Sequence, residues 1–195
     1  MSVIIGLTGP TGAGKSTVSV TAERFGFKVI DCDKTARKAA EKGTEGLAAL
    51  VNAFGKGILM TDGSLNRKAL ASAAFKDKAS TELLNKTLLP YIVKLIFREA
   101  GNENSLLDAP TLFESGIDKA CLKTVAVLAD KKIRKTRIIE RDGLSEKEAL
   151  LRMNAGKSDD FYKNRADYII YNNGDENAVI KRFSDILKEI TEESL

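Results

Sequence analysis

The sequence predicts a doubly wound α/β domain, and two patterns along the chain carry this prediction. Short apolar runs alternate with segments of helical periodicity from one end of the chain to the other. The runs are continuous rather than alternating in polarity, as expected of strands in a parallel sheet that helices cover on both faces. The expected strands are Val3–Leu7, Phe27–Ile30, Ser105–Leu107, Thr124–Leu128 and Tyr168–Tyr171.

The helical segments at the two ends of the chain support the same layered fold. Directly after the first strand and a glycine-rich loop, apolar side chains recur at helical spacing at Val18, Ala22 and Phe25. Near the end of the chain, apolar residues at intervals of three and four predict a helix with one face against the sheet: Val179, Phe183, Ile186 and Ile190.

Between about Thr44 and Gly101 the pattern changes to successive short helices without a strand signal. Two of the expected helices run from Arg67 to Phe75 and from Pro90 to Ala100, with the proline at the first helical position. The pair Asp62-Gly63 marks a turn between helices. We expect a helical insertion that lies over the sheet within a single domain.

Length and composition limit the classes of function. A chain of 195 residues that is 43% hydrophobic can bury one sizeable core. Its 31 basic and 27 acidic residues give a net charge of +4, so nucleic acid is not the expected partner. This mild excess suits either a phosphate pocket or a solvated surface. The chain has no histidine, which excludes histidine-based catalytic triads and histidine-ligated metals.

The cysteines and the hydropathy pattern indicate the compartment. Cys32 and Cys121 are far apart in sequence and form no C-x-x-C pair, so neither a disulfide framework nor a zinc site is indicated. The first apolar run is too short for a secretory signal, and no stretch approaches membrane-spanning length. We expect a soluble cytoplasmic protein without a membrane partner, either a monomer or a small homo-oligomer.

The glycine-rich loop after the first strand fits the pattern G-x-x-x-x-G-K-[ST] and lies between a predicted strand and a predicted helix. Its glycines let successive backbone N–H groups converge on phosphate oxygens at a helix N-terminus. Lys15 should reach the β- and γ-phosphates of ATP, and Ser16 should bind Mg²⁺ through its hydroxyl. The residues expected to bind ATP here are Gly9, Pro10, Thr11, Gly12, Ala13, Gly14, Lys15, Ser16 and Thr17.

Carboxylates follow two of the predicted strands, at the sheet edge where open α/β folds bind their ligands. Asp31 and Asp33 come directly after the second strand, and Asp108 closes the third, with Glu114 a little further on. Asp33 has two readings, a catalytic carboxylate or the N-cap of a helix from Lys34 to Glu41. Asp108 is expected to hold magnesium through water or to orient a substrate.

Three arginines after the fourth strand fall within one narrow arc of a predicted helix: Arg134, Arg137 and Arg141. Such a stripe faces either water or phosphates. Glycines and a polar run follow it at Gly143, Gly156 and Lys157–Asp160, which suggests a mobile segment. An arginine-bearing lid of this kind would neutralise transition-state charge and exclude water.

Taken together, the motifs resemble those of dephospho-coenzyme A kinases along nearly the whole chain. The matching segments, in family order, are GLTGPTGAGKSTV, VIDCDKTAR, FGKGIL with DGSLNRKALASAAF, LDAPTLFESG, RKTRIIERDGLSEKEALLRM and ADYIIYNNG. The phosphate loop alone specifies only a superfamily. The D-x-D-x-x-A-R, DG-x-L-x-R-x-x-L and R-x-x-x-R-D-G segments together are specific to this family.

The resemblance implies an architecture and a reaction. It implies a three-layer P-loop kinase domain over residues 1–195 with a five-stranded parallel sheet. Residues from about 61 to 100 would form a helical coenzyme A-binding insertion, and residues from about 137 to 157 a lid. The implied reaction is transfer of a phosphoryl group from ATP, with Mg²⁺, to the ribose 3′-hydroxyl of dephospho-coenzyme A.

The resemblance also assigns roles to individual side chains. Asp33 matches the family's catalytic base, Lys15 and Ser16 its phosphate and magnesium groups, and Arg141 its lid arginine. The remaining expected ATP contacts are Arg137, Asn172 and Gly174, of which the last two lie in a loop near adenine. The expected substrate contacts are Asp31, Asp33, Arg67, Asp108 and Glu114.

Four positions depart from the family pattern and leave alternatives open. Leu89 stands where a histidine is usual, glutamines are usual at Gly156 and near Arg134, and Tyr171 replaces an acidic residue. These changes concern acceptor binding and lid contacts rather than the phosphate machinery. The alternatives are a nucleoside or nucleotide kinase and an ATP-binding module with little turnover.

Overall fold

The computed structural model describes residues 2–192, and within them five strands form one parallel sheet in the order β2-β3-β1-β4-β5. The strands are β1 Ile4–Thr8, β2 Lys28–Asp31, β3 Ser105–Asp108, β4 Lys123–Leu128 and β5 Tyr168–Tyr171. The predicted five-stranded parallel sheet is therefore confirmed.

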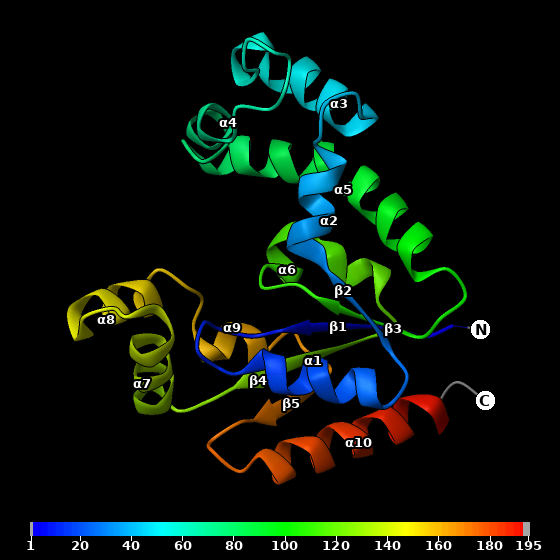
Figure 1. The fold of residues 1–195 in the computed structure, drawn as a ribbon, viewed down its shortest axis with the longest axis vertical. Helices are drawn as coiled ribbons and strands as arrows, with labels where there is room; N and C mark the ends of the chain where they lie inside the picture. The colour runs from blue at the N-terminus through cyan, green and yellow to red at the C-terminus, as the bar shows by residue number, and fades with distance from the viewer. Residues whose placement is uncertain (1, 193–195) are drawn as a thin grey trace.

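Helices cover both faces of this sheet, which gives the three layers seen in Figure 1. The α-helices are α1 Lys15–Arg24, α2 Cys32–Ala39, α3 Glu45–Phe54, α4 Arg67–Ala74, α5 Lys78–Ala100, α6 Leu112–Ser115, α7 Lys131–Asp142, α8 Glu146–Asn154, α9 Asp159–Lys163 and α10 Glu176–Glu192. Two short 3₁₀ helices, η1 Lys56–Ile58 and η2 Ile117–Ala120, complete the set. Within residues 2–192 no helix combines the length and the apolar character needed to cross a membrane.

The core consists of two apolar layers, one on each face of the sheet. Successive strand residues point alternately into one layer and the other. Ile5 and Leu7 of β1 pack on one face against α1 and α10, where Phe183 is fully buried. Ile4 and the next strand's Leu107 pack on the other face against α2, α5 and α6. The helix predicted from the spacing of Val179, Phe183, Ile186 and Ile190 lies in the first of these layers, so its single apolar face is confirmed.

The helical insertion has a small core of its own above the sheet. Leu50 of α3, Ile58 of η1 and Leu70 of α4 pack together with the first half of α5. Figure 1 shows α3 and α4 standing away from the sheet, with α5 connecting them to it. The predicted turn at Asp62-Gly63 is present, within a small hairpin that the antiparallel bridge between Leu59 and Leu65 closes.

The prediction that Pro90 begins a helix is wrong. Pro90 lies inside α5, which runs without interruption from Lys78 to Ala100. Its side chain is exposed. The carbonyl of Lys86, which loses its helical hydrogen bond to the proline, is on an exposed residue and can be hydrated. Figure 1 shows α5 changing direction along its length, and a proline near the middle of the helix accounts for that bend.

The second strand and the helix after it both differ from the sequence prediction. Phe27 is not in β2, because its N–H donates to Ala22 at the end of α1 and the ladder with β3 begins at Lys28. Helix α2 begins at Cys32 rather than Lys34. Its N-cap is Asp31, not Asp33, so the capping interpretation of Asp33 is wrong.

The parallel strand order places the candidate site residues at the carboxyl edge of the sheet. β1 is central: the chain runs from β1 to β2 and β3 on one side of it, and the connection from β3 to β4 then crosses to the other side, where β4 and β5 lie. Loops after β1 and β3 therefore diverge at a topological switch point, where open α/β sheets bind ligands. Asp31 and Asp108 are direct register partners at the carboxyl ends of β2 and β3.

Candidate active site

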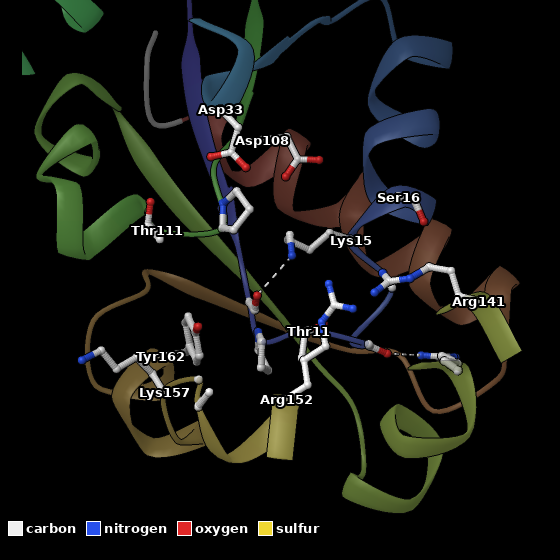
Figure 2. Close-up of a pocket in the computed structure, with 18 of the residues that line it drawn as sticks. Thr11, Lys15, Ser16, Asp33, Asp108, Thr111, Arg141, Arg152, Lys157 and Tyr162 are labelled. Carbon is white, nitrogen blue, oxygen red and sulfur yellow. Dashed lines mark hydrogen bonds between the residues drawn. The ribbon is translucent and has the colours of Figure 1, made fainter. Parts of the chain in front are cut away.

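A cavity of about 1060 Å³ lies at the carboxyl edge of the sheet, between the loop after β1, the start of α2 and the α7–α8 region. Figure 2 shows its side chains arriving from these different elements. A volume of this size is at the upper end for small-molecule sites and can hold two substrates side by side. A smaller, largely apolar cavity of about 180 Å³ adjoins it and shares Asp33 and Thr111 with it.

The loop after β1 is a phosphate cradle whose conformation requires glycine. Gly14 caps α1 in the left-handed region at φ 85°, and a Cβ there would lie 2.4 Å from Nδ2 of Asn172. A Cβ on Gly9 would lie 2.2 Å from the carbonyl oxygen of Val127. The loop can therefore take this path only with glycine at these positions. It leads directly into the N-terminus of α1, where backbone N–H groups bind anions.

Lys15 reaches back over this loop, and its Nζ donates to the carbonyl oxygen of Gly9 at 3.1 Å. Burial lowers the pKa of Lys15, and the nearby Arg141 guanidinium lowers it further, whereas the Asp108 carboxylate acts in the opposite direction. Burial and Arg141 thus disfavour the charged form of Lys15, and a bound anion such as a phosphate would stabilise it.

Two arginines of α7 hold the same loop from behind. Nε of Arg134 donates to the carbonyl oxygen of Thr11 at 3.0 Å, and its Nη1 pairs with Asp159 at 3.0 Å. Arg137 donates to the carbonyl oxygens of Ala13 at 3.2 Å and Asn172 at 3.0 Å, and to Oδ1 of Asn172 at 3.1 Å. Because these bonds occupy loop carbonyls, they favour the orientation that leaves loop N–H groups free for an anion.

Three aspartates, Asp31, Asp33 and Asp108, line the cavity, and their hydrogen-bond partners differ. Asp108 accepts from the Ser19 hydroxyl at 3.1 Å, and burial raises its pKa although Lys15 opposes the shift. Asp31 caps α2; burial would raise its pKa, but hydrogen bonds from Lys34 outweigh that and lower it. Asp33 is exposed in the first turn of α2, and its side chain forms no hydrogen bond or ion pair with any other residue in the described range. Of these three aspartates, Asp33 is thus the one free to meet a substrate.

Glu114 and Tyr162 also line the cavity. The Oε2 atom of Glu114 is buried without a hydrogen-bond partner among residues 2–192. Burial raises the pKa of Tyr162 to about 12, and the Glu114 carboxylate adds to the shift. A buried acceptor without a donor is costly, so Glu114 is suited to accept a hydrogen bond from a bound molecule.

The helices α7 and α8 present two further guanidinium groups to the cavity. Arg141 and Arg152 both line it, and both are paired with Asp142 at 2.8 Å. Figure 2 shows Arg141, Arg152 and Lys15 extending from three elements toward the same part of the cavity. Cations converge there opposite the carboxylates of Asp33 and Asp108, as a phosphoryl-transfer site needs.

The structure brings most of the sequence-predicted site residues to this one cavity. Its lining includes Gly9, Pro10, Thr11, Gly12, Gly14, Lys15, Ser16, Asp31, Asp33, Asp108, Glu114, Arg137 and Arg141. The predicted residues outside the lining are Ala13, Thr17, Arg67, Asn172 and Gly174. Arg67 is exposed at the start of α4, and Asn172 is buried behind the loop, where its Nδ2 donates to the carbonyl oxygen of Gly14 at 3.3 Å.

Sequence reasoning missed several lining residues: Pro110, Thr111, Glu140, Arg152, Ala155, Gly156, Lys157 and Tyr162. Thr111 follows Asp108 closely enough that its place after β3 was a usable signal. Arg152 and Lys157 lie in the expected lid, but their spacing does not reveal which way they face. Tyr162 belongs to the five-residue helix α9, which is too short for a periodic signal.

Comparisons with known proteins identify the family of this chain. A family model described as dephospho-CoA kinase matches residues 3–178. A dephospho-CoA kinase of Listeria innocua is 39% identical over 179 residues, which cover 89% of this chain and 90% of the relative. A dephospho-CoA kinase of Arabidopsis thaliana is 37% identical over 193 residues, covering 96% of this chain and 83% of the relative.

A solved structure shares the fold along nearly the whole chain. The crystal structure of TT1252 from Thermus thermophilus superposes with a TM-score of 0.75 at 30% sequence identity. The match covers 96% of this chain and 97% of that one. The insertion and the α7–α8 region therefore fall within the shared architecture, not only the sheet.

Proposed function

The chain belongs to the dephospho-CoA kinase family, and on that premise we propose how its own side chains transfer the γ-phosphoryl group of ATP to the 3′-hydroxyl of dephospho-coenzyme A. The observation that carries the proposal is the cavity in which Lys15, Arg141 and Asp33 meet. The family match does not favour a nucleoside or nucleotide kinase.

The phosphates of ATP bind on the loop from Gly9 to Gly14 and on the N-terminus of α1. Backbone N–H groups of the loop and the Lys15 ammonium contact the β- and γ-phosphate oxygens. Arg137 supports this contact from behind through the loop carbonyls. The assignment of Asn172 and Gly174 to the adenine side stays a prediction, since neither lines the cavity.

The donor set fits Mg²⁺ bound together with the nucleotide. Ser16 is exposed at the first turn of α1, and both Ser16 and Asp108 line the cavity, so a hydroxyl and a carboxylate provide hard oxygen donors. Residues 2–192 contain no group of three or more metal-ligating side chains, and Mg²⁺ with nucleotides needs only one or two protein ligands beside phosphates and water. When bound, Mg²⁺ supplies charge neutralisation at the β- and γ-phosphates.

Asp33 orients the acceptor hydroxyl. Its exposed carboxylate accepts the hydrogen bond of the 3′-hydroxyl and aims that oxygen at the γ-phosphorus. The new bond forms from the 3′-oxygen to phosphorus, the bond to the β–γ bridging oxygen breaks, and ADP leaves with that electron pair. The hydroxyl proton passes to Asp33 late in the step, because the transition state is largely dissociative.

Arg141 stabilises the charge of the γ-phosphoryl group as it moves. Its side chain is 57% exposed and lines the cavity beside Lys15, from the end of α7. Residues from about 137 to 157 act as the lid that brings this charge over ATP and excludes water.

The other end of the acceptor meets the helical insertion of residues from about 61 to 100. Asp31, Asp108 and Glu114 line the acceptor side of the cavity, and one buried oxygen of Glu114 has no hydrogen-bond partner within residues 2–192. Arg67 joins them only if α4 moves toward the cavity on binding.

Cys32 and Cys121 are both free thiols, which supports a cytoplasmic location.

One assay tests the acceptor assignment. Purified protein with ATP and Mg²⁺ should release ADP rapidly with dephospho-coenzyme A and slowly with AMP, with nucleosides or without acceptor, and coenzyme A should be the product. Lys15→Ala serves as the control for ATP use and should abolish all of these activities. Faster turnover of AMP or a nucleoside would overturn the acceptor, and ATP binding without ADP release would overturn the kinase.

A further inference from the structure

Asp142 holds two arginines of the α7–α8 region at once. Nε and Nη2 of Arg141 donate to its two carboxylate oxygens at 2.8 and 2.9 Å, and Nη1 of Arg152 donates to Oδ2 at 2.8 Å. The Asp142 side chain is only 20% exposed, whereas those of Arg141 and Arg152 are 57% and 51% exposed. The carboxylate is thus covered by two guanidinium groups that remain open toward the cavity.

The backbone is arranged to bring these three residues together. Asp142 is the last residue of α7, and Gly143 ends the helix in the left-handed conformation at φ 64°. Ser145 and Glu148 then form a capping box that starts α8, which carries Arg152 in its last turn. Ile138, Ala149 and Met153 pack between the two helices and fix their spacing.

Most hydrogen-bond donors of the two arginines remain available. Of the five N–H groups of a guanidinium, Arg141 uses two and Arg152 uses one on Asp142, and no other hydrogen bond of either side chain is found within residues 2–192. Lys15 faces the same part of the cavity, where Arg141 is close enough to lower the pKa of its ammonium. Lys15, Arg141 and Arg152 therefore face the same part of the cavity. The Asp142 carboxylate fixes the positions of the two arginines.

We propose that Asp142 is a positioning residue that presents Arg141 and Arg152 together, and that Arg152 is a second phosphate-contacting arginine in the transfer step. This inference rests on the proposed function, because it assigns both guanidinium groups to phosphates of bound ATP. Arg141 faces the γ-phosphoryl group, and Arg152 contacts a neighbouring phosphate oxygen from α8. Asp142 touches no phosphate; it limits the rotation of both side chains before ATP arrives.

The test compares Asp142→Asn with a matched lid variant, Glu146→Gln. Glu146 pairs with Lys135 and also joins α8 to α7, but neither residue lines the main cavity. Asp142→Asn should lower kcat roughly 10- to 100-fold, the scale of lost charge-assisted hydrogen bonds, and change the Kd of ATP about threefold or less. Asp142→Glu should recover part of kcat, and Glu146→Gln should stay within about twofold of wild type.

Two further variants separate positioning from folding. Arg152→Gln should lower kcat by about tenfold or more, and Arg152→Lys should fall between it and wild type because lysine keeps the charge without the fork. In the Arg141→Gln/Arg152→Gln background, adding Asp142→Asn should not lower kcat further, since its partners are gone. Thermal midpoints measured alongside show whether each variant is folded at the assay temperature, and Asp142→Glu carries the test if Asp142→Asn is not.

The proposal fails if Asp142→Asn or Arg152→Gln keeps kcat within about twofold of wild type, or if Glu146→Gln loses as much as Asp142→Asn. Failure of the proposed function has a different signature. In that case wild-type protein makes no coenzyme A but phosphorylates another acceptor. The kcat of the same variants is then measured with that acceptor.

Discussion

The two ends of helix α7 carry arginines with opposite tasks. Arg134, near its start, is only 4% exposed and is held between a loop carbonyl and Asp159. Arg141, at its end, is 57% exposed in its side chain and offers unused donors to the cavity. Arg137 lies between them and donates to loop carbonyls while still lining the cavity.

This difference shows that residue type and helical spacing do not decide what an arginine does. All three lie on one face of α7, but that face passes over the rear of the phosphate loop before it reaches open space. Where loop carbonyl oxygens lie opposite, as at Arg134, the guanidinium becomes part of the scaffold. Where the cavity lies opposite, as at Arg141, Asp142 takes two of the five N–H groups and the others are available for phosphate. Breaking each end of α7 in turn should therefore have different consequences.

The largest effect is expected at the open end. Arg141→Ala should lower kcat roughly 10³-fold, because the lost charge is needed most as the γ-phosphoryl group moves. The Kd of ATP and the thermal midpoint should change little, since the side chain is exposed and its partner Asp142 keeps Arg152. Steady-state kinetics with equilibrium ATP binding check this, with Lys132→Ala on the solvent side of α7 as control. A fall in ATP affinity as large as that in kcat would make Arg141 an ordinary anchor.

At the buried end the expected effect is on stability. Arg134→Met removes one partner of a largely buried ion pair and should lower the free energy of unfolding by about 2–4 kcal/mol. The melting temperature should fall by about 4 °C or more. Lys135→Met, also on α7, breaks the more exposed ion pair with Glu146 of α8 and should cost about 1 kcal/mol or less. Equal thermal midpoints for the two variants would contradict the scaffold role of Arg134.

A smaller effect separates the two aspartates at the start of α2. Asp31→Ala should lower the free energy of unfolding by about 1 kcal/mol, because it removes the N-cap, and Asp33→Ala by about 0.5 kcal/mol or less. The pKa of Asp31 is lowered in the folded protein, so its contribution is present above the pKa of the unfolded chain. It is lost as the pH falls through the folded pKa. Denaturant unfolding at neutral and acidic pH measures the free energy of unfolding of both variants. A larger decrease in Asp33→Ala than in Asp31→Ala would show that Asp33 is the N-cap.

The sequence was sufficient for the sheet and for the phosphate loop because both depend on local patterns. Continuous apolar runs identified all five strands, and β5 has the predicted bounds. The loop motif specified its own conformation through the glycines that its path requires. The place of Asp31 and Asp108 at one edge followed from the parallel sheet alone.

What the sequence did not reveal depends on packing across the fold. The unbroken α5 contradicts a sound local rule about proline, because an exposed ring within a long helix is tolerated once tertiary contacts hold both halves. The division of the α7 arginines depends on the loop behind them, which is more than 100 residues away in sequence. Arg152 was missed because only the turn at Gly143 brings it back to Asp142.

Replacement of Asp33 by asparagine tests the central claim, that this carboxylate aims the acceptor hydroxyl at ATP. Asparagine keeps the size of the side chain, and Asp31 keeps capping α2, so folding and ATP affinity should survive. With saturating ATP and dephospho-coenzyme A, kcat of Asp33→Asn should fall roughly 10²- to 10⁴-fold, the range for lost acid–base help. A kcat near that of wild type would contradict the account and move the role to Asp108 or Asp31.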